Sequence, residues 1–320
     1  MPLIDSNYRT SPLLFNGHLE TIFPYLYRPE ISVHYHRERM ELTDGDFLDL
    51  DWLKEGRERL AILCHGLEGS SDSQYMKGMA KALHAKGWDV LAINFRSCSG
   101  EMNRLLRMYH HGEIEDLTSV IDYVIQTRDY QAISLCGFSL GGNVIIKYLG
   151  TQGSKVPLII RSAMAVSVPC DLASSSQALD RWSSYFYTRR FRRSLRKKFE
   201  LKNRMFPGTL DLKDFEKVKS WYDFDSKYTT RLTSFDSADY YYTQGSANNY
   251  IAGVRTTTLL INAANDPFLK SPSYPYALCE AHPYVSLEIP TRGGHVGFWY
   301  PGLPHSYLED RASEFFDQHI

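Results

Sequence analysis

AISLCGFSLGGNVIIKYLG, residues 132–150, is the stretch of sequence that decides the fold of this chain. A short apolar run, long enough for a buried strand, leads into the pentapeptide G-F-S-L-G at 137–141. Apolar residues at helical spacing then follow from Val144 to Leu149. A serine between glycines, on a turn from a strand to a helix, is typical of a nucleophile elbow, where glycines let strand and helix approach closely. The stretch therefore predicts Ser139 as a nucleophile.

Composition limits the kind of protein that surrounds this turn. The 320 residues are 43 % hydrophobic and 23 % charged, with a formal net charge of −1, which argues against a general nucleic-acid binder. Five scattered cysteines without a C-x-x-C pair favour a reducing cytoplasm over a disulfide framework. No apolar run approaches the ~18 residues of a membrane span, and the N-terminus lacks a signal-peptide pattern. We expect a soluble, cytoplasmic protein without a membrane span.

Strand-like and helical runs alternate along the rest of the chain. Strands are expected at 60–64, 88–94, 132–136, 164–168, 256–262 and 284–289, and helices at 75–83, 117–125 and 307–316. Such alternation predicts βαβ units, and hence an α/β fold with a mostly parallel central sheet that carries helices on both faces.

Two N-terminal segments depart from this alternation. Residues 1–29 are rich in aromatic residues and proline and show no clear period, which predicts an arm on the surface of the domain. Apolar and polar residues alternate over 31–35, and 47–52 is strand-like again, with turn chemistry at Asp44-Gly45. The pattern predicts an antiparallel hairpin at a sheet edge.

The alternation also stops between Leu172 and Gly253. This segment is aromatic-rich and helical in pattern, and it contains no convincing buried strand. Because the strand pattern resumes at 256–262, the segment reads as an insertion late in the sheet. We expect one domain over residues 1–320, with a helical lid inserted at about 172–253.

A serine nucleophile needs a base, and the base needs an acid that fixes its tautomer. Asp266 follows the expected strand 256–262, and His295 follows the strand 284–289 after two glycines. Ligands bind at the carboxyl ends of strands in open α/β sheets, and Ser, Asp, His is the chain order that accompanies a nucleophile elbow. Ser139, Asp266 and His295 are therefore the candidate catalytic residues.

Other acids compete with Asp266 for the same role. Asp171 follows the strand 164–168, although its position before Leu172 suits a helix N-cap. Asp236 and Asp239 lie before the strand pattern resumes and are weaker candidates.

An oxyanion hole requires backbone N–H groups aimed at the developing charge. One candidate donor is Leu140, directly after the serine. The other is Leu67, because the loop HGLEGSS at 65–71 follows a strand and its glycine permits the required turn. The alternative is a glycine-rich loop without a chemical role.

Several motifs together carry a more specific signal. They are SPLLFNGHLETI (11–22), HGLEGS (65–70), NFRSCSGEMNR (94–104), RMYHHGEIEDL (107–117), GFSLGGN (137–143), NAANDPF (262–268) and GGHVGF (293–298). With these motifs the chain resembles the YheT-like branch of the α/β-hydrolase superfamily over nearly its whole length. The resemblance implies an α/β-hydrolase core with a helical lid, a Ser139–Asp266–His295 triad and carboxylesterase-type activity.

The chain departs from the branch at three positions. Asn265 precedes Asp266 where relatives commonly show two adjacent aspartates, which leaves one acid in the motif. Ser97 and His111 stand where relatives more often have glycine and serine.

Two polar segments have roles that the sequence leaves open. The first, 107–111, either lines the pocket or braces its loop, and we favour bracing; its polar members are Arg107, Tyr109, His110 and His111. The second, 181–204, holds ten Lys or Arg against one acid, with Phe191, Leu195 and Phe199 four residues apart. It could contact anionic lipid as a peripheral membrane helix, although a solvated helix face over a core is the commoner outcome.

The sequence thus predicts a serine hydrolase that cleaves small-molecule carboxylic esters through an acyl-enzyme. Two alternatives stay open: a lipid-directed phospholipase or acyltransferase on the same triad, and a non-catalytic binding module with this fold. No cluster has metal-ligand spacing and no loop is built to cradle phosphate, so no metal or other cofactor is expected.

Overall fold

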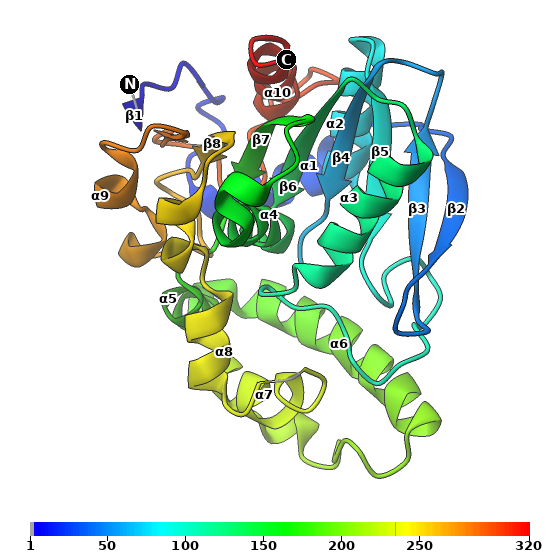
Figure 1. Cartoon of the computed structure of the whole chain (residues 1–320). Helices are drawn as coiled ribbons and strands as arrows, with labels where there is room; N and C mark the ends of the chain where they lie inside the picture. The colour runs from blue at the N-terminus through cyan, green and yellow to red at the C-terminus, as the bar shows by residue number, and fades with distance from the viewer. Residues whose placement is uncertain (1–2, 234) are drawn as a thin grey trace.

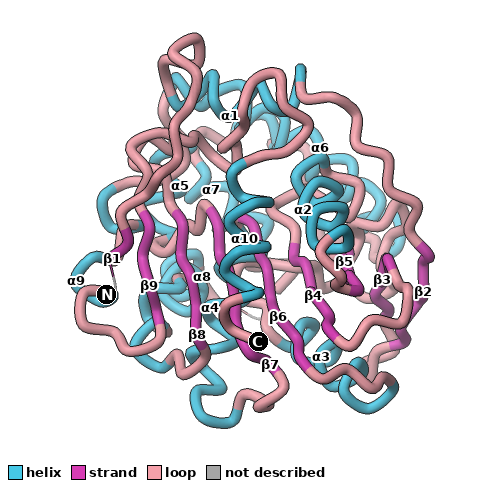
Figure 2. The backbone as a smooth tube through the Cα atoms, turned by 90° about the horizontal axis from the view of Figure 1, so that it is seen from above, coloured by secondary structure: helices cyan, strands magenta, loops and turns pink. Residues whose placement is uncertain are grey.

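One nine-stranded sheet forms the centre of the molecule. The computed structural model describes residues 3–233 and 235–320. The strands lie in the order β1-β9-β8-β7-β6-β4-β5-β3-β2 (Figure 2). Their bounds are β1 Leu3–Ile4, β2 His36–Glu41, β3 Phe47–Leu53, β4 Arg59–Cys64, β5 Asp89–Asn94, β6 Ala132–Phe138, β7 Ile160–Val166, β8 Thr257–Ile261 and β9 Val285–Glu288. Only β3 pairs antiparallel, with β2 and β5, and the other neighbours are parallel. The mostly parallel α/β sheet is therefore confirmed.

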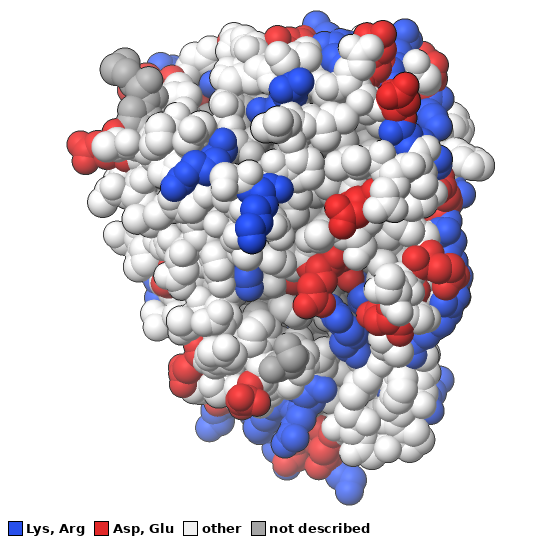
Figure 3. Space-filling view, in the orientation of Figure 1, with Lys and Arg blue, Asp and Glu red and all other residues white. Residues whose placement is uncertain are grey.

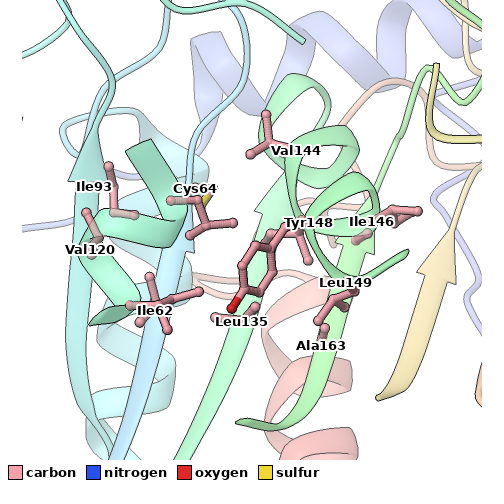
Figure 4. Packing of buried hydrophobic residues seen from close by; sticks show 14 of the residues in the cluster. Ile62, Cys64, Ile93, Val120, Leu135, Val144, Ile146, Tyr148, Leu149 and Ala163 are labelled. Atoms are coloured by element: carbon pink, nitrogen blue, oxygen red, sulfur yellow. The ribbon is translucent and has the colours of Figure 1, made fainter. Parts of the chain in front are cut away.

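Helices cover both faces of this sheet, as predicted. On one face α2 (Gln74–Ala85) packs beside α10 (Tyr307–Asp317), and on the other lie α3 (Glu115–Thr127) and α4 (Leu140–Gln152) (Figure 1). The central strands are apolar on both sides because each face is covered. In β4, Leu60 and Ile62 join the cluster under α3 and α4, whereas Ala61 and Leu63 join the cluster under α2 and α10. Figure 4 shows the first cluster, with Tyr148 of α4 between the strands and the helix.

The predicted edge hairpin forms, but its first strand lies later in the chain than expected. The residues paired with β3 are 36–41, with Glu41 opposite Phe47 and His36 opposite Trp52. Residues 31–35 belong to no strand. A turn at 42–46 can only pair the residues that directly flank it, so turn geometry overrode the alternating pattern at 31–35.

The N-terminal arm is more deeply integrated than the sequence indicated. Leu3–Ile4 adds a parallel strand to β9, and α1 (Gly17–Tyr27) buries Gly17, Glu20 and Pro24. The arm packs on the domain as predicted, and it forms a strand and a helix that the lack of a clear period did not indicate. The helix begins at a side-chain cap, because Asn16 accepts a hydrogen bond from the N–H of Leu19 at 2.9 Å.

The segment between β7 and β8 is helical, and its described residues contain no strand. Its α-helices are α5 (Leu172–Leu179), α6 (Tyr185–Met205), α7 (Trp221–Phe224) and α8 (Ala238–Gly245). They lie together below the sheet in Figure 1 rather than in the layers on its faces. Aromatic side chains of α6 and α7, among them Phe199, Trp221 and Phe224, form a hydrophobic cluster separate from those of the sheet.

Short elements connect these parts. They are 3₁₀ turns at Gly153–Lys155, Trp182–Ser184, Phe215–Lys217, Ala247–Asn249, Ile251–Gly253 and Ser271–Ser273, a π turn at Asp225–Thr229, and the helix α9 (Tyr276–Cys279).

The distribution of charged, apolar and cysteine side chains can be compared with what the composition predicted. Figure 3 shows basic and acidic side chains mixed along the right side and the lower end of this face, whereas its left and centre are largely uncharged. No helix within 3–233 or 235–320 is both long enough and apolar enough to cross a membrane. All five cysteines are buried and unpaired.

Candidate active site

Ser139 occupies the sharp turn that the G-x-S-x-G pattern predicts. β6 ends at Phe138 and α4 begins at Leu140, and Ser139 between them has φ +53° and ψ −115°. A left-handed backbone at a non-glycine residue costs about 1–3 kcal/mol and persists where its surroundings enforce it. Here a Cβ on Gly137 would lie 2.5 Å from the carbonyl oxygen of Gly141, and one on Gly141 would lie 2.3 Å from that of Cys64. The two glycines therefore allow the close packing that fixes this turn.

Asp266 and His295 come together at the ends of neighbouring strands. Asp266 follows β8 and His295 follows β9, and the His295 Nδ1 lies 2.8 Å from Asp266 Oδ2. The carboxylate is fully buried and also accepts a hydrogen bond from the N–H of Phe268 at 2.8 Å. The Phe268 ring packs on the imidazole with 4.1 Å between centroids. With Nδ1–H donated to Asp266, Nε2 is the nitrogen left to accept a proton.

The loop after β4 holds Leu67 beside the serine turn. A Cβ on Gly66 would lie 3.2 Å from the Ser139 Cβ, so a side chain at this position would crowd the serine. His65 anchors the loop from below: its Nε2 accepts from the N–H of Phe95 at 3.1 Å and its Nδ1 lies 2.7 Å from the carbonyl of Gly66. Burial lowers the pKa of His65 to about 3, which keeps the ring neutral. Leu67 N–H makes no hydrogen bond to any described part of the chain.

A single large cavity joins these groups. Its volume is about 1090 Å³, and Ser139, His295, Leu67 and Leu140 all line it. The segment between β7 and β8 contributes mainly apolar and aromatic walls, which include Leu179, Phe186, Phe191, Leu195, Phe199, Trp221, Phe224, Tyr241 and Tyr242. Asp266 is not among the lining residues and lies behind His295. The structure thus brings the five sequence-predicted site residues to one place.

Supporting residues from α1, which the sequence did not single out, hold the histidine loop. The Glu20 carboxylate accepts the N–H of Gly293 at 3.0 Å and pairs with Arg292 at 3.0 Å. Thr21 Oγ1 accepts the N–H of His295 at 2.9 Å. Helix and loop press together so closely that a Cβ on Gly17 would lie 1.9 Å from the carbonyl oxygen of Asn265. The signal that could have found them is the motif at 11–22.

A second support reaches the Leu67 loop from α6. Glu68, with φ +54°, buries its carboxylate, and Oε1 accepts from the Tyr109 hydroxyl at 2.8 Å and from Lys198 Nζ at 2.8 Å. Ser194 donates to the other carboxylate oxygen. The Tyr109 hydroxyl in turn accepts the N–H of Glu68 at 2.7 Å. Ser194 and Lys198 of α6 therefore both bind Glu68, the residue that follows Leu67.

The segment 107–111 both braces and lines the cavity. Arg107 pairs with Glu113 outside the cavity, whereas Tyr109, His110 and His111 are among its lining residues. His111 Nδ1 lies 2.8 Å from the Tyr241 hydroxyl of α8. Burial lowers the pKa of His110 to about 3 and that of His111 to about 4.

The apolar repeat within the basic segment 181–204 follows the commoner of the two interpretations. Leu195 and Phe199 are buried in the hydrophobic cluster of α6 and α7, and Phe191 packs against it. The four-residue apolar repeat is therefore a core face and not a face toward lipid.

Two of the competing acids make hydrogen bonds away from His295, and the third is exposed. The side chain of Asp171 caps α5 by accepting the N–H of Ser174 at 2.7 Å. Asp239 accepts the Tyr222 hydroxyl at 2.9 Å on the surface, and Asp236 is exposed. In the described part of the chain, no three His, Cys, Asp or Glu side chains are grouped as a metal site.

Sequence comparison agrees with this geometry and defines the class of protein. Residues 61–301 match the family described as the alpha/beta hydrolase fold. This chain belongs to the α/β-hydrolase family.

Individual relatives indicate which branch of the family the chain resembles. The chain is 33 % identical to YheT of Escherichia coli (strain K12), which carries the name of an esterase, over 95 % of this chain and 91 % of YheT. It is 27 % identical to Phospholipase ABHD3 of Homo sapiens, over 93 % of this chain and 75 % of that protein. The predicted resemblance to the YheT-like branch is thereby confirmed.

A solved structure supports the fold alone. The esterase Pf2001 of Pyrococcus furiosus superposes with a TM-score of 0.64 at 20 % sequence identity, covering 90 % of this chain and 92 % of that one.

Proposed function

We propose that this hydrolase cleaves carboxylic esters through a Ser139–His295–Asp266 triad. The observation that carries the proposal is the pairing of the strained Ser139 turn with the Asp266-bound His295 in the same cavity. Such a turn exposes the serine hydroxyl at the end of the strand. An imidazole with a fixed tautomer is the base that this hydroxyl needs in order to act as a nucleophile.

In the proposed reaction, Ser139 Oγ attacks the ester carbonyl while His295 Nε2 takes its proton. The N–H groups of Leu67 and Leu140 bind the oxyanion. His295 then returns the proton to the leaving alcohol, and an acyl-enzyme remains on Ser139. Water, deprotonated by His295, attacks this acyl group, and the acid leaves as Ser139 regains its proton. No metal or other cofactor enters any of these steps.

We further propose that residues 172–253 act as a lid within a single domain. These residues leave the sheet after β7, return before β8, and supply much of the apolar wall over Ser139. Cavity size and apolar lining favour an ester with a long acyl or aryl group. The five unpaired, buried cysteines support a cytoplasmic location, which cell fractionation would test.

Rates on p-nitrophenyl esters of increasing chain length, with a Ser139→Ala variant beside the native chain, test this function. We expect Ser139→Ala to lose about 10⁴-fold or more of kcat while unfolding at the same denaturant concentration. Comparable esterase activity in that variant would refute the triad. A native chain that neither turns over esters nor reacts with a fluorophosphonate probe would instead be a binding module.

A second candidate function uses the same residues on lipids. The 1090 Å³ cavity and a relative named as a phospholipase favour phospholipid cleavage or acyl transfer. Product analysis with a labelled phospholipid separates the two, because hydrolysis releases free fatty acid and transfer moves the label to an added alcohol.

A further inference from the structure

Exposed apolar side chains gather on α1 and at the start of α6, and on the residues just before each helix. Eleven large apolar or aromatic side chains in the described residues are more than half exposed, and eight of them lie within 13–27 and 182–186. Trp182 is 92 % exposed, Leu13 80 % and Phe186 75 %. We call these eight the apolar rim: Leu13, Phe15, Tyr25, Leu26, Tyr27, Trp182, Tyr185 and Phe186. Single exposed apolar residues need no explanation, but a cluster of this kind marks an interaction surface.

The two segments of the rim lie side by side. The His18 ring of α1 stacks on the Tyr187 ring of α6 with 5.8 Å between centroids. Further along, the Arg190 guanidinium lies 4.5 Å from the centroid of Tyr25. These contacts join two segments that are more than 150 residues apart in the sequence into one surface.

This surface borders the cavity that holds Ser139. Tyr25, Leu26, Phe186 and Arg190 are exposed, and they also line that cavity. The rim therefore lies where a substrate would pass between the surroundings and the serine.

Free positive charge accompanies the rim. Arg181, Arg189, Arg190 and Arg193 are exposed, and none forms an ion pair with a carboxylate of the described residues. The acid nearest in sequence, Asp180, accepts the N–H of Trp221. Glu30 and Asp72 also line the cavity, so its wall is mixed in charge, whereas the start of α6 is basic.

We propose that the apolar rim docks this hydrolase on an anionic lipid surface, from which its ester substrate enters the cavity. Tryptophan, tyrosine and arginine side by side are the composition of a helix that lies in a membrane interface. A protein partner on the rim would close the cavity, whereas a lipid surface both holds the rim and supplies an acyl ester. The proposal rests on the proposed function for the nature of the substrate, but docking itself requires no catalysis.

The proposal differs from the lipid contact considered from the sequence. The four-residue apolar repeat of α6 points into the core, so the apolar docking residues of this segment are instead those before and at its first turn, and exposed arginines of its first turns add positive charge. They become a surface only because α1 packs beside them.

Sedimentation of the full chain with vesicles tests the docking. Vesicles of phosphatidylcholine alone are compared with vesicles that carry about one third phosphatidylglycerol, at low and high salt. We expect binding to the anionic vesicles that weakens with salt. Trp182→Ser combined with Phe15→Ser should weaken vesicle binding about tenfold or more, because both changes remove apolar area that would be buried in the bilayer. Neither residue lines the cavity, so the double variant leaves the candidate active site untouched. Arg189→Gln with Arg193→Gln should weaken vesicle binding and flatten its salt dependence.

The control is Leu158→Ser, which removes a side chain 87 % exposed outside the rim and should leave binding unchanged. Ser139→Ala should bind as the native chain does, so loss of activity and loss of docking are separated. No binding to anionic vesicles, or equal binding by Trp182→Ser/Phe15→Ser, would overturn the proposal. A dimer in solution that this double variant dissociates would also overturn it, because the rim would then be a contact between protein copies.

Discussion

The sheet and the helical segment 172–253 meet at the same cavity but are built differently. On the sheet, the candidate catalytic groups sit at positions that leave the backbone little choice, as the glycines around Ser139 show. The helical segment has its own aromatic cluster and gives the cavity mostly apolar wall. The difference indicates that backbone packing fixes the positions of the candidate catalytic groups, whereas most of the cavity wall consists of side chains that can vary without moving those groups.

Polar contacts join the two regions at several places. Lys198 of α6 pairs with Glu68 of the Leu67 loop, and Lys202 donates to the carbonyl of Asn103 at 2.9 Å. On the other side, Asn143 of α4 donates to the carbonyl of Gly245 and accepts the N–H of Ala247. These contacts are where a change in one region should be felt in the other.

The largest expected effect falls on the sheet side. Asp266→Asn should lower kcat about 10⁴-fold, because an amide no longer holds the His295 tautomer that leaves Nε2 free. Asp171→Asn, which alters only a helix cap, is the control and should retain activity. Both are measured as kcat on a soluble ester. If Asp171→Asn proved the more damaging, the assignment of the acid would be wrong.

The stability of the sheet and of the helical segment 172–253 can be compared by making one large-to-small substitution in the core of each. Leu135→Ala in β6 and Phe199→Ala in α6 each leave a cavity worth about 3 kcal/mol. We expect the first to lower the global free energy of unfolding, and the second to lower hydrogen-exchange protection mainly in α6 and α7. Equal loss of protection in β4 and β6 of Phe199→Ala would mean that both regions unfold as one unit.

The ion pair between Lys198 and Glu68, which joins the two regions, should affect kcat. Lys198→Met leaves the Glu68 carboxylate buried without its cation, which disturbs the loop that carries Leu67. We expect kcat to fall about tenfold with little change in KM, and the neighbouring exposed Lys197→Met to behave as the native chain. Adding Glu68→Gln to Lys198→Met should restore part of the rate, because the unpaired charge is gone. A change confined to KM would assign Lys198 to substrate binding instead.

The smallest effect concerns acid stability. The pKa of buried His110 is about 3 in the folded chain against 6.5 for an unperturbed histidine, so as pH falls the unfolded chain takes up the proton first and stability is lost. Urea unfolding of His110→Phe should show a weaker pH dependence between pH 6 and 4, by up to about 1.4 kcal/mol per pH unit. Exposed Leu158→Ser, which removes no titratable group, should match the native slope. An unchanged slope in His110→Phe would show that the pKa of His110 is not lowered in the folded chain.

Local patterns in the sequence predicted most of the sheet and the candidate site. Apolar runs predicted every central strand to within a few residues, and glycines marked Ser139, Leu67 and His295. These residues can be predicted from the sequence because each lies beside a glycine in the loop or turn that follows a strand. Their catalytic roles stay a prediction that the variants above test.

What the sequence left open depends on residues far apart in the chain. Glu20 and Thr21 support a loop more than 270 positions away, and no periodicity in 1–29 signals that contact. The strand at 36–41 was misplaced because its pairing is decided by the turn that follows.

By itself, then, the sequence determined the order of strands and helices and the residues at their carboxyl ends. Those features follow from the period of apolar residues and from glycine, which act within a few positions of the chain. Tertiary structure alone decided that α1 holds the histidine loop, that Lys198 reaches Glu68, and that the two segments of the apolar rim lie side by side. Such contacts depend on which surfaces pack together, and packing joins residues that share no local pattern.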